Sequence, residues 1–391
     1  MTKLIDITGK AVSGEWGMDD ESGDGTLVLR TTNFTNNGVV DYTDVVTRNL
    51  GKKDISGKYL KHGDIIIEKS GGSDNQPVGR VIFFEGPENT YLFNNFTGLL
   101  RVKDQERWFP RYVFYALFEN YRRGGTKPFE NRTTGLHNLQ TESYVSMTTI
   151  PNVDISTQKE MCETLDRVLN IIEARKSQIR FLDQFIKARF VEMFGDPMTN
   201  AKGYELKKYG DVFELNAGGT PSKTHPEYWE GGTISWIGSN MCQDRYIYEN
   251  DGKYITQEGY DNSSARLFPI DTVLVALVGA TIGKTALLKF ETTTNQNVLG
   301  IRGIRESGYL PEFVYYYTQG LYKKFIGISD GGFSMASKGF ISELPIPVVP
   351  LALQEEFTSF ADQVDKSKVV VQKVLDEAQL LFDSLIQKYF G

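Results

Sequence analysis

The sequence predicts an α+β protein in which two similar, mixed α/β globular units are separated by two long coiled-coil helices. Three observations support this prediction. Residues 150–195 return as residues 346–391, at a constant offset of 196 residues and without a gap. Both copies carry apolar residues at alternating steps of three and four, which is the heptad seam of a coiled coil. The segments that precede the two copies also resemble each other loosely.

The fixed offset indicates a chain of two related halves, because self-similarity at a constant spacing marks an internal repeat. A chain of 391 residues also exceeds what one hydrophobic core usually covers. The matching positions are Gln158 and Gln354, Glu160 and Glu356, Asp166 and Asp362, Val168 and Val364, and Phe194-Gly195 and Phe390-Gly391.

Each copy predicts one long helix. No proline lies between Asn152 and Phe194 or between Leu351 and Phe390, and about forty residues at 1.5 Å per residue form a rod of roughly 60 Å. The predicted seams consist of Leu165, Val168, Ile172, Ile179, Leu182, Ile186 and Met193, and of Ala361, Val364, Val371, Leu375, Ala378, Phe382, Leu385 and Tyr389.

Both helices need a partner along their length. Since each helix leaves a globular unit and the halves repeat, we expect the two to pair antiparallel around a pseudo-twofold axis. Pairing between two chains, as a dimerisation stalk, is the alternative. The predicted order is a first globular unit at 1–149, a central helix at 150–196, a second globular unit at 197–345 and a C-terminal helix at 346–391.

Within the globular units, apolar runs bounded by Gly, Asn and Asp predict strands. In the first unit these are residues 26–30, 63–67, 78–84 and 91–102, with a polar loop at 71–76 and a helix at 112–122. Residues 29–33, 64–67 and 110–115 match 236–240, 271–275 and 311–316 in the second unit. The loops differ more than the scaffold, as is typical where loops carry specificity.

The composition is that of an ordinary globular protein, with 40% hydrophobic and 24% charged residues. The sequence shows no apolar run of the roughly twenty residues that span a membrane and no signal-peptide core, so we expect a cytoplasmic protein without a membrane partner. The net charge of −7 argues mildly against nucleic acid. Residues 101–132, however, carry eight basic and four acidic residues.

Metal and disulfide chemistry is not expected. The two cysteines and three histidines are scattered singly, which fits neither a disulfide framework nor a zinc site. Asp20, Asp24 and Gly25 resemble part of a calcium loop, but Ser22 and Thr31 stand where that motif needs ligands. We interpret this segment as a solvated turn.

Residues 279–285 resemble a phosphate-binding loop, which would indicate a nucleotide hydrolase that uses Lys284. Three residues separate Gly279 and Gly283, whereas the motif has four, and no convincing helix pattern follows. The sequence also has no Pro-Pro pair for the Asn/Asp-Pro-Pro-aromatic segment of amino-methylating enzymes. We therefore predict no catalytic residues.

A set of motifs in the second half, taken together, is similar to the specificity subunit of type I restriction-modification enzymes. These are Gly210-Asp211-Val212, Gly218-Gly219-Thr220-Pro221-Ser222, Tyr228-Trp229, Ile234-Ser235-Trp236, Gly279-Ala280-Thr281-Ile282-Gly283-Lys284, Asn295-Gln296-Asn297 and Leu344-Pro345-Ile346-Pro347. The first half has Ser13-Gly14-Glu15-Trp16-Gly17 at its start instead. The resemblance extends over essentially the whole chain.

The resemblance implies a non-catalytic subunit with two target-recognition domains, each of which reads one half of a bipartite, asymmetric site in double-stranded DNA. The paired helices would set the spacing of the half-sites. Two methyltransferase (modification) subunits would bring S-adenosylmethionine, and restriction subunits would bring ATP and Mg²⁺. No cofactor is expected on this chain itself.

Polar loop residues at repeat-matched positions are the candidates for DNA contact, since Asn, Gln, Ser, Thr and Arg form hydrogen bonds with base edges. In the first unit they are Arg30, Thr31, Thr32, Asn33, Asn75, Gln76, Arg80, Lys127, Asn131 and Arg132. In the second they are Thr220, Ser222, Lys223, Ser239, Asn240, Thr281, Lys284, Ser334, Ser337 and Lys338. The alternative is a helical scaffold that binds protein partners without DNA specificity.

Overall fold

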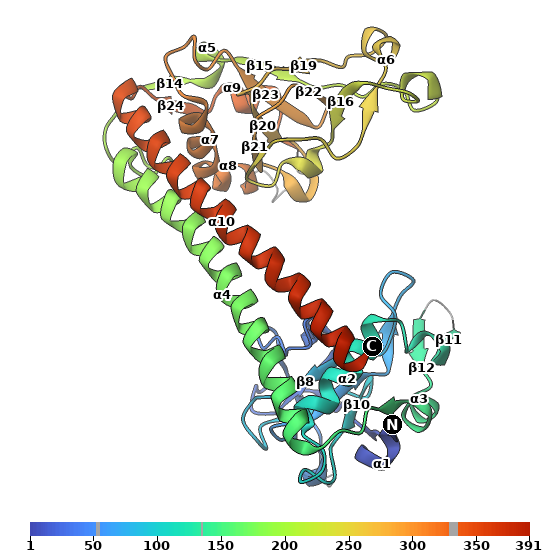
Figure 1. Ribbon diagram of the computed structural model, residues 1–391. Helices are drawn as coiled ribbons and strands as arrows, with labels where there is room; N and C mark the ends of the chain where they lie inside the picture. The colour runs from blue at the N-terminus through green and yellow to red at the C-terminus, as the bar shows by residue number, and fades with distance from the viewer. Residues whose placement is uncertain (52–54, 134–135, 328–334) are drawn as a thin grey trace. The chain divides into compact units, whose positions relative to one another are not determined.

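The computed structural model describes residues 1–391 with the exception of 52–54, 134–135 and 328–334 (Figure 1). It falls into two compact units, one formed by residues 1–176 and 373–391 and the other by residues 177–372. Each unit therefore contains one half of each long helix and a globular part. The division into four segments drawn from the sequence stays a prediction.

The globular part of the first unit combines short strands with a few helices. Its strands are β1 (Thr2–Lys3), β2 (Val12–Ser13), β3 (Met18–Asp19), β4 (Thr26–Leu29), β5 (Val46–Asn49), β6 (Ile65–Glu68), β7 (Ser70–Gly72), β8 (Val81–Phe83), β9 (Tyr91–Phe93), β10 (Thr97–Leu100), β11 (Glu130–Thr133), β12 (Leu136–Leu139) and β13 (Thr149–Ile150). Its helices are α1 (Leu4–Thr8), α2 (Pro110–Arg122) and α3 (Thr141–Met147), with the 3-10 turns η1 (Thr31–Asn33), η2 (Ser56–Lys58) and η3 (Lys127–Phe129).

These strands form small sheets. One has the order β2-β10-β6-β8 and is antiparallel. A second has the order β3-β5-β4-β9, in which β4 and β9 run parallel. A third has the order β11-β12-β7, and β1 pairs with β13. The strands predicted at 26–30, 63–67 and 78–84 and the helix α2 are confirmed.

The prediction of a single strand at 91–102 is wrong. Strand β9 runs parallel to β4, whereas β10 runs antiparallel to β6. Between them the chain turns, and the amide of Thr97 donates to the carbonyl of Asn94 at 3.1 Å. The two apolar runs belong to different sheets, so the Asn-Asn step between them is a turn and not a strand interior.

The second unit repeats this plan. Its strands are β14 (Leu206–Lys208), β15 (Glu214–Ala217), β16 (Ile234–Ile237), β17 (Arg245–Ile247), β18 (Tyr254–Ile255), β19 (Leu267–Phe268), β20 (Val273–Ala276), β21 (Thr285–Leu288), β22 (Thr292–Thr294), β23 (Val298–Arg302) and β24 (Pro345–Pro347). Its helices are α5 (Tyr209–Val212), α6 (Gln257–Asp261), α7 (Pro311–Gly320), α8 (Tyr322–Ile326) and α9 (Lys338–Ser342), with the turns η4 (Pro226–Tyr228), η5 (Ser239–Met241) and η6 (Gly279–Thr281).

Strand pairing confirms the internal repeat. The order β15-β23-β20-β21 corresponds to β2-β10-β6-β8, and the parallel pair β16 and β22 corresponds to β4 and β9. The pair β14 and β24 corresponds to β1 and β13. The second unit adds β17, which runs parallel to β21. The two units thus share a set of paired strands and differ in the strands added to it.

The long helices are α4 (Ile155–Phe194) and α10 (Leu351–Phe390). In the first unit the N-terminal half of α4 shares a hydrophobic core with the C-terminal half of α10, and in the second unit the opposite halves do so. The helices are therefore antiparallel, as predicted. Phe190, Ile386 and Phe390 are also buried, off the predicted seam. They share hydrophobic cores with residues of α7 or α2, and this burial widens the apolar face beyond a strict heptad.

A buried glutamine fixes each long helix to its own globular part. Gln158 accepts a hydrogen bond from the amide of Phe109 at 2.8 Å and donates to the carbonyls of Arg107 and Val153. Gln354 accepts from the amide of Leu310 at 2.9 Å and donates to the carbonyls of Gly308 and Val349. Both side chains are fully buried. The repeated Gln thus anchors the start of each helix.

Candidate nucleic-acid interface

The turn after β4 presents the first group of predicted contact residues. Asn33 is buried and its amide closes this turn: Oδ1 accepts from the amide of Arg30 at 2.8 Å, and Nδ2 donates to the carbonyls of Asp41 and Asp44. Arg30 donates to the carboxylate of Asp44 at 2.7 Å. Thr32 is exposed, and Thr31 is half-buried. Asn33 therefore shapes the loop, while the threonines face outward or toward neighbouring loops.

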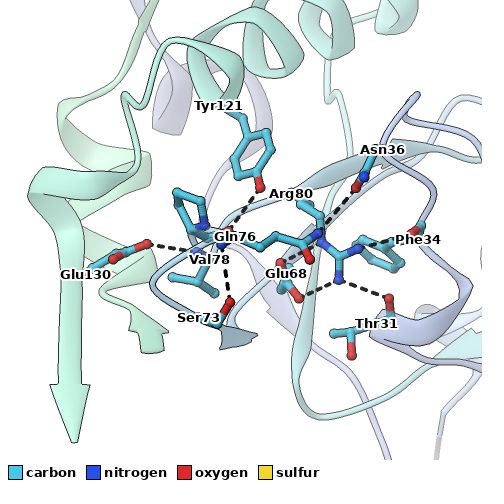
Figure 2. Close-up of polar contacts among 11 residues, drawn as sticks. Thr31, Phe34, Asn36, Glu68, Ser73, Gln76, Val78, Arg80, Tyr121 and Glu130 are labelled. Atoms are coloured by element: carbon cyan, nitrogen blue, oxygen red, sulfur yellow. Dashed lines mark hydrogen bonds and ion pairs between the residues drawn. The ribbon is translucent and has the colours of Figure 1, made fainter. Parts of the chain in front are cut away.

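The polar loop at residues 73–78 lies against this turn (Figure 2). The side-chain amides of Gln76 and Asn36 lie 3.3 Å apart, and this contact links the two loops. The base of the loop is held by Glu130, which accepts from the amide of Val78 at 2.8 Å, and by the hydroxyl of Tyr121, which donates to a loop carbonyl at 3.1 Å. Asn75 is exposed at the tip.

The hairpin of β11 and β12 completes this surface. Glu130, at the start of β11, contacts both Val78 and His137, whose Nδ1 lies 3.3 Å from Oε2 of Glu130. Asn131 is exposed, and its Oδ1 accepts from the side-chain Nε2 of Gln140 at 2.8 Å. Lys127, in η3, is exposed, and the backbone of Arg132 lies in β11. Three loops far apart in sequence are therefore in contact.

The second unit brings its candidates together at the ends of β15, β16 and β22. The hydroxyl of Thr220 donates to Oε1 of Gln296 at 2.6 Å. The amide of Asn295 donates to the carbonyl of Ile237, directly before η5, which carries Ser239 and Asn240. Asn240 is exposed and Ser239 is half-buried. These residues form one polar surface.

A second group lies where loop 279–284 meets the segment before α9. Val278 and Met335 form an isolated bridge, and the amide of Ala336 donates to the carbonyl of Leu277 at 2.9 Å. The hydroxyl of Ser337 accepts from the amide of Phe340 at 3.1 Å and so caps α9. Lys338, the first residue of α9, is exposed. Ser334 lies outside the described residues.

The remaining candidates of this unit have local partners. The hydroxyl of Thr281 donates to the carbonyl of Val278 at 3.5 Å. The hydroxyl of Ser222 lies 2.7 Å from that of Thr224, and Lys223 between them is exposed. These side chains are thus placed at the surface, with Ser222 and Thr281 partly committed to their own loops.

The segment 279–285 is not built as a phosphate-binding loop. The turn η6 leads into strand β21, where a nucleotide-binding loop would lead into a helix. The ammonium of Lys284 lies 2.7 Å from Oδ2 of Asp244. This hydrogen bond raises the pKa of Lys284 and holds its charge within the protein. The geometry gives no support to the nucleotide hydrolase alternative.

Two equivalent positions, Phe96 and Asn297, are absent from the candidates that the sequence predicts. The carbonyl of Phe96 accepts from the amide of Lys69 at 2.7 Å, and the carbonyl of Asn297 accepts from the amide of Leu277 at 2.8 Å. The two residues are therefore equivalent, and Phe96 is 51% exposed. Gln296, beside Asn297, contacts Thr220. The repeat offset of 201 that relates the helices α2 and α7 would have aligned Phe96 with Asn297.

Comparison with known proteins identifies the family. The family model described as the type I restriction modification DNA specificity domain matches residues 21–180 and again residues 201–378. The chain belongs to the specificity subunits of type I restriction-modification systems.

Related specificity subunits include that of the type I restriction enzyme MjaIX from Methanocaldococcus jannaschii, 32% identical over 187 residues, and that of EcoR124I/EcoR124II from Escherichia coli, 25% identical over 225 residues. The alignments cover 46% and 54% of this chain and 42% and 52% of those subunits. The chain thus matches about half the length of these relatives.

Solved structures show the same fold. The type I restriction-modification S subunit from M. genitalium covers all of this specificity subunit with a TM-score of 0.56 at 15% identity. A chain from a study of complex assembly in a type I restriction-modification system gives a TM-score of 0.56 at 14% identity. At these identities the likeness concerns the fold.

Other kinds of site find little support in the described part of this specificity subunit. Outside 52–54, 134–135 and 328–334, it has no group of three His, Cys, Asp or Glu side chains that could hold a metal ion. In the described part of the chain, no helix has both the length and the apolar character needed to cross a bilayer. Cys162 and Cys242 are buried free thiols, and burial raises the pKa of Cys242 to about 12.

Proposed function

We propose that this specificity subunit reads a bipartite, asymmetric DNA sequence, with one half-site for each globular domain, and that it catalyses no reaction itself. The observation that carries the proposal is a shared scaffold whose equivalent loop positions hold different side chains. Phe96 in one unit corresponds to Asn297 in the other. Base-edge contacts depend on donor and acceptor patterns, so different side chains on one scaffold select different bases.

The exposed side chains suit this role. Thr32, Asn75, Asn131 and Asn240 are exposed polar groups on the loop surfaces described above, and such groups form hydrogen bonds with base edges. Lys127, Lys223 and Lys338 are exposed as well and are the proposed phosphate contacts. A few local cations can bind DNA despite a net charge of −7, because phosphate neutralisation is a local effect.

The partners follow from the repeat and from the family. Two modification subunits would each find an equivalent scaffold, one per half of the chain, and would carry S-adenosylmethionine. Restriction subunits would carry ATP and Mg²⁺. This subunit would supply recognition and docking without a cofactor of its own.

Sequencing the methylome of a host that expresses the chain with its modification subunits tests the proposal. Exchange of residues 1–149 for the corresponding domain of another specificity subunit should change one half of the modified motif and leave the other half intact. Exchange of residues 197–345 should have the reciprocal effect. Methylation without sequence preference, or a change of both half-sites in each chimera, would favour the helical scaffold.

A further inference from the structure

Arg80 and Lys284 occupy the same position in the two units. The carbonyl of Arg80 accepts from the amide of Glu68 at 2.8 Å, and the carbonyl of Lys284 accepts from the amide of Ala276 at 2.9 Å. Glu68 and Ala276 end the equivalent strands β6 and β20. Each cation thus stands directly before the next strand of the hairpin, beside the loops that hold the candidate DNA contacts.

In the first unit, the guanidinium of Arg80 is enclosed by protein groups (Figure 2). Nε and Nη2 donate to the two carboxylate oxygens of Glu68 at 3.0 and 2.8 Å. Nη1 donates to the carbonyl of Phe34 at 3.1 Å, and Nη2 also donates to that of Thr31 at 3.2 Å. The side chains of Arg80 and Glu68 are 15% and 1% exposed. Arg80 therefore binds the turn η1 to the end of the hairpin.

In the second unit, Lys284 holds the segment that follows the equivalent turn, η5, by different chemistry. Its ammonium lies 2.7 Å from Oδ2 of Asp244, whose Oδ1 accepts from the amide of Thr285 at 3.0 Å. Asp244 has a positive φ of 55° and follows η5 by three residues. The ammonium also lies 4.7 Å from the ring centre of Tyr322. Lys284 therefore binds the segment after η5 to the start of β21.

We propose that Arg80 and Lys284 are positioning residues that set the pose of the η1 turn and of the segment after η5, respectively, and thereby the specificity of their half-sites, instead of contacting DNA phosphates. The inference rests on the proposed function. Each cation already has a carboxylate partner inside its unit, and a phosphate would have to compete with it. The same tethering task is done by Arg with Glu in one unit and by Lys with Asp in the other, which fits support of a loop better than readout of a shared ligand.

The test uses the full chain in complex with its modification subunits and duplex DNA with randomised bases as the probe. The variants are Lys284→Met, Asp244→Asn, and the double change Arg80→Met with Glu68→Gln, which removes both buried charges together. Discrimination in the half-site read by the altered unit should fall about 5- to 150-fold, the range for loss of a well-placed base contact. The other half-site and the slope of affinity against salt concentration should stay unchanged.

Lys127→Met and Lys338→Met are the matched controls, one exposed lysine in each unit. Each should reduce the salt slope by about 0.9, the value for one lost phosphate contact, with little change of motif. Asp244→Asn separates the two roles most sharply. A tether predicts relaxed specificity, as in Lys284→Met, whereas a phosphate-binding Lys284 would be freed by this change and would bind more tightly.

Either of two results would overturn the positioning role. One is a smaller slope of affinity against salt concentration with an unchanged recognition motif in Lys284→Met. The other is tighter DNA binding in Asp244→Asn. If the double variant does not fold, the second-unit variants decide, because Lys284 is 32% exposed and can be replaced with less disturbance. A wild-type complex without half-site preference would instead contradict the proposed function.

Discussion

Among single residues, the hydrogen-bond partners decide which polar side chains remain available to a ligand. The side-chain amide of Asn33 uses its hydrogen bonds on the backbone of Arg30, Asp41 and Asp44 and so stabilises a loop. Thr32, one residue earlier, is exposed. The same logic makes the buried glutamines structural, since a buried amide without partners is unfavourable. Residue type alone does not separate these roles.

Gln158→Leu should lower the free energy of unfolding of the first unit by about 1–3 kcal/mol, because the amide of Phe109 loses its buried acceptor. Gln354→Leu should do the same in the second unit. Urea denaturation with hydrogen exchange to localise the effect measures both. Gln363→Leu, at an exposed position of α10, is the control and should change stability by less than about 0.5 kcal/mol. Equal losses in all three variants would contradict the anchoring role.

Asp20 should titrate well below its ordinary range. The hydroxyl of Ser22 and the amide of Gly25 donate to its carboxylate and lower its pKa from 3.8 to about 2. Because the folded pKa is depressed, this turn is stabilised fully above about pH 4, and the stabilisation is lost as the pH falls toward 2. NMR titration of the carboxyl carbon measures the pKa. Ser22→Ala should move it back toward 3.8, and an unchanged pKa in that variant would contradict the assignment.

At the scale of elements, the two units hold equivalent ion pairs with reversed charges. The amides of Phe84 and Leu288 pair with the carbonyls of Asp64 and Thr272, which makes the next residues, Glu85 and Lys289, equivalent. Glu85 pairs with Arg111 of α2 at 3.4 Å, and Lys289 pairs with Glu312 of α7 at 2.9 Å. Both units therefore keep an ion pair between the helix and the sheet, but the acidic and basic partners exchange places.

Lys289→Glu should destabilise the second unit by about 3–5 kcal/mol, because Glu312 is 9% exposed and would lose its cation. Adding Glu312→Arg recreates the charge order of the first unit and should recover part of this loss. A double-mutant cycle from chemical denaturation measures the coupling energy. A coupling energy near zero would show that the pair does not hold α7 to the sheet.

At the scale of the whole molecule, the C-terminal residues belong to the N-terminal unit. Residues 373–391 form one compact unit with residues 1–176. The ring of Phe390 lies 5.0 Å from that of Tyr112, and Arg122 of α2 pairs with Asp383 at 2.6 Å. Ile386 is fully buried in the same core. The first unit is thus completed by the last residues of the chain.

Truncation after residue 372 should unfold the first unit, although the deleted residues are far from it in sequence. Removing the buried Phe382, Ile386 and Phe390 forfeits roughly 5 kcal/mol or more, at about 1.5–3 kcal/mol for each side chain. Hydrogen exchange should show loss of protection in residues 1–176 and continued protection in the globular part of the second unit. Phe181→Ala, at a 68% exposed position of α4, is the control and should leave protection intact. Loss of protection confined to residues 177–372 would contradict this division of the chain.

Much of the architecture was accessible from the sequence. The long helices, their antiparallel pairing and the internal repeat follow from apolar periodicity and a fixed offset. Apolar periodicity is visible within a short segment, and the fixed offset is visible when the chain is compared with itself. The prediction of one strand at 91–102 is wrong because two neighbouring apolar runs enter different sheets. No local pattern distinguishes a turn between two sheets from a strand interior when the polar segment that interrupts the apolar runs is only a few residues long.

The candidate interface was accessible in outline only. The loops were found because polar residues between strands are visible in sequence, and the structure brings several of them into contact. Residue type and position predict Arg80 and Lys284 as DNA contacts, yet their partners, the Thr31 carbonyl and the Asp244 carboxylate, lie 49 and 40 positions away in the chain. The repeat, the helical scaffold and the positions of the loops can be read from the amino-acid sequence alone, since they depend on periodicity. Which cations are committed to internal partners becomes visible only in the folded chain, because a hydrogen bond depends on distance in space and not on distance along the chain.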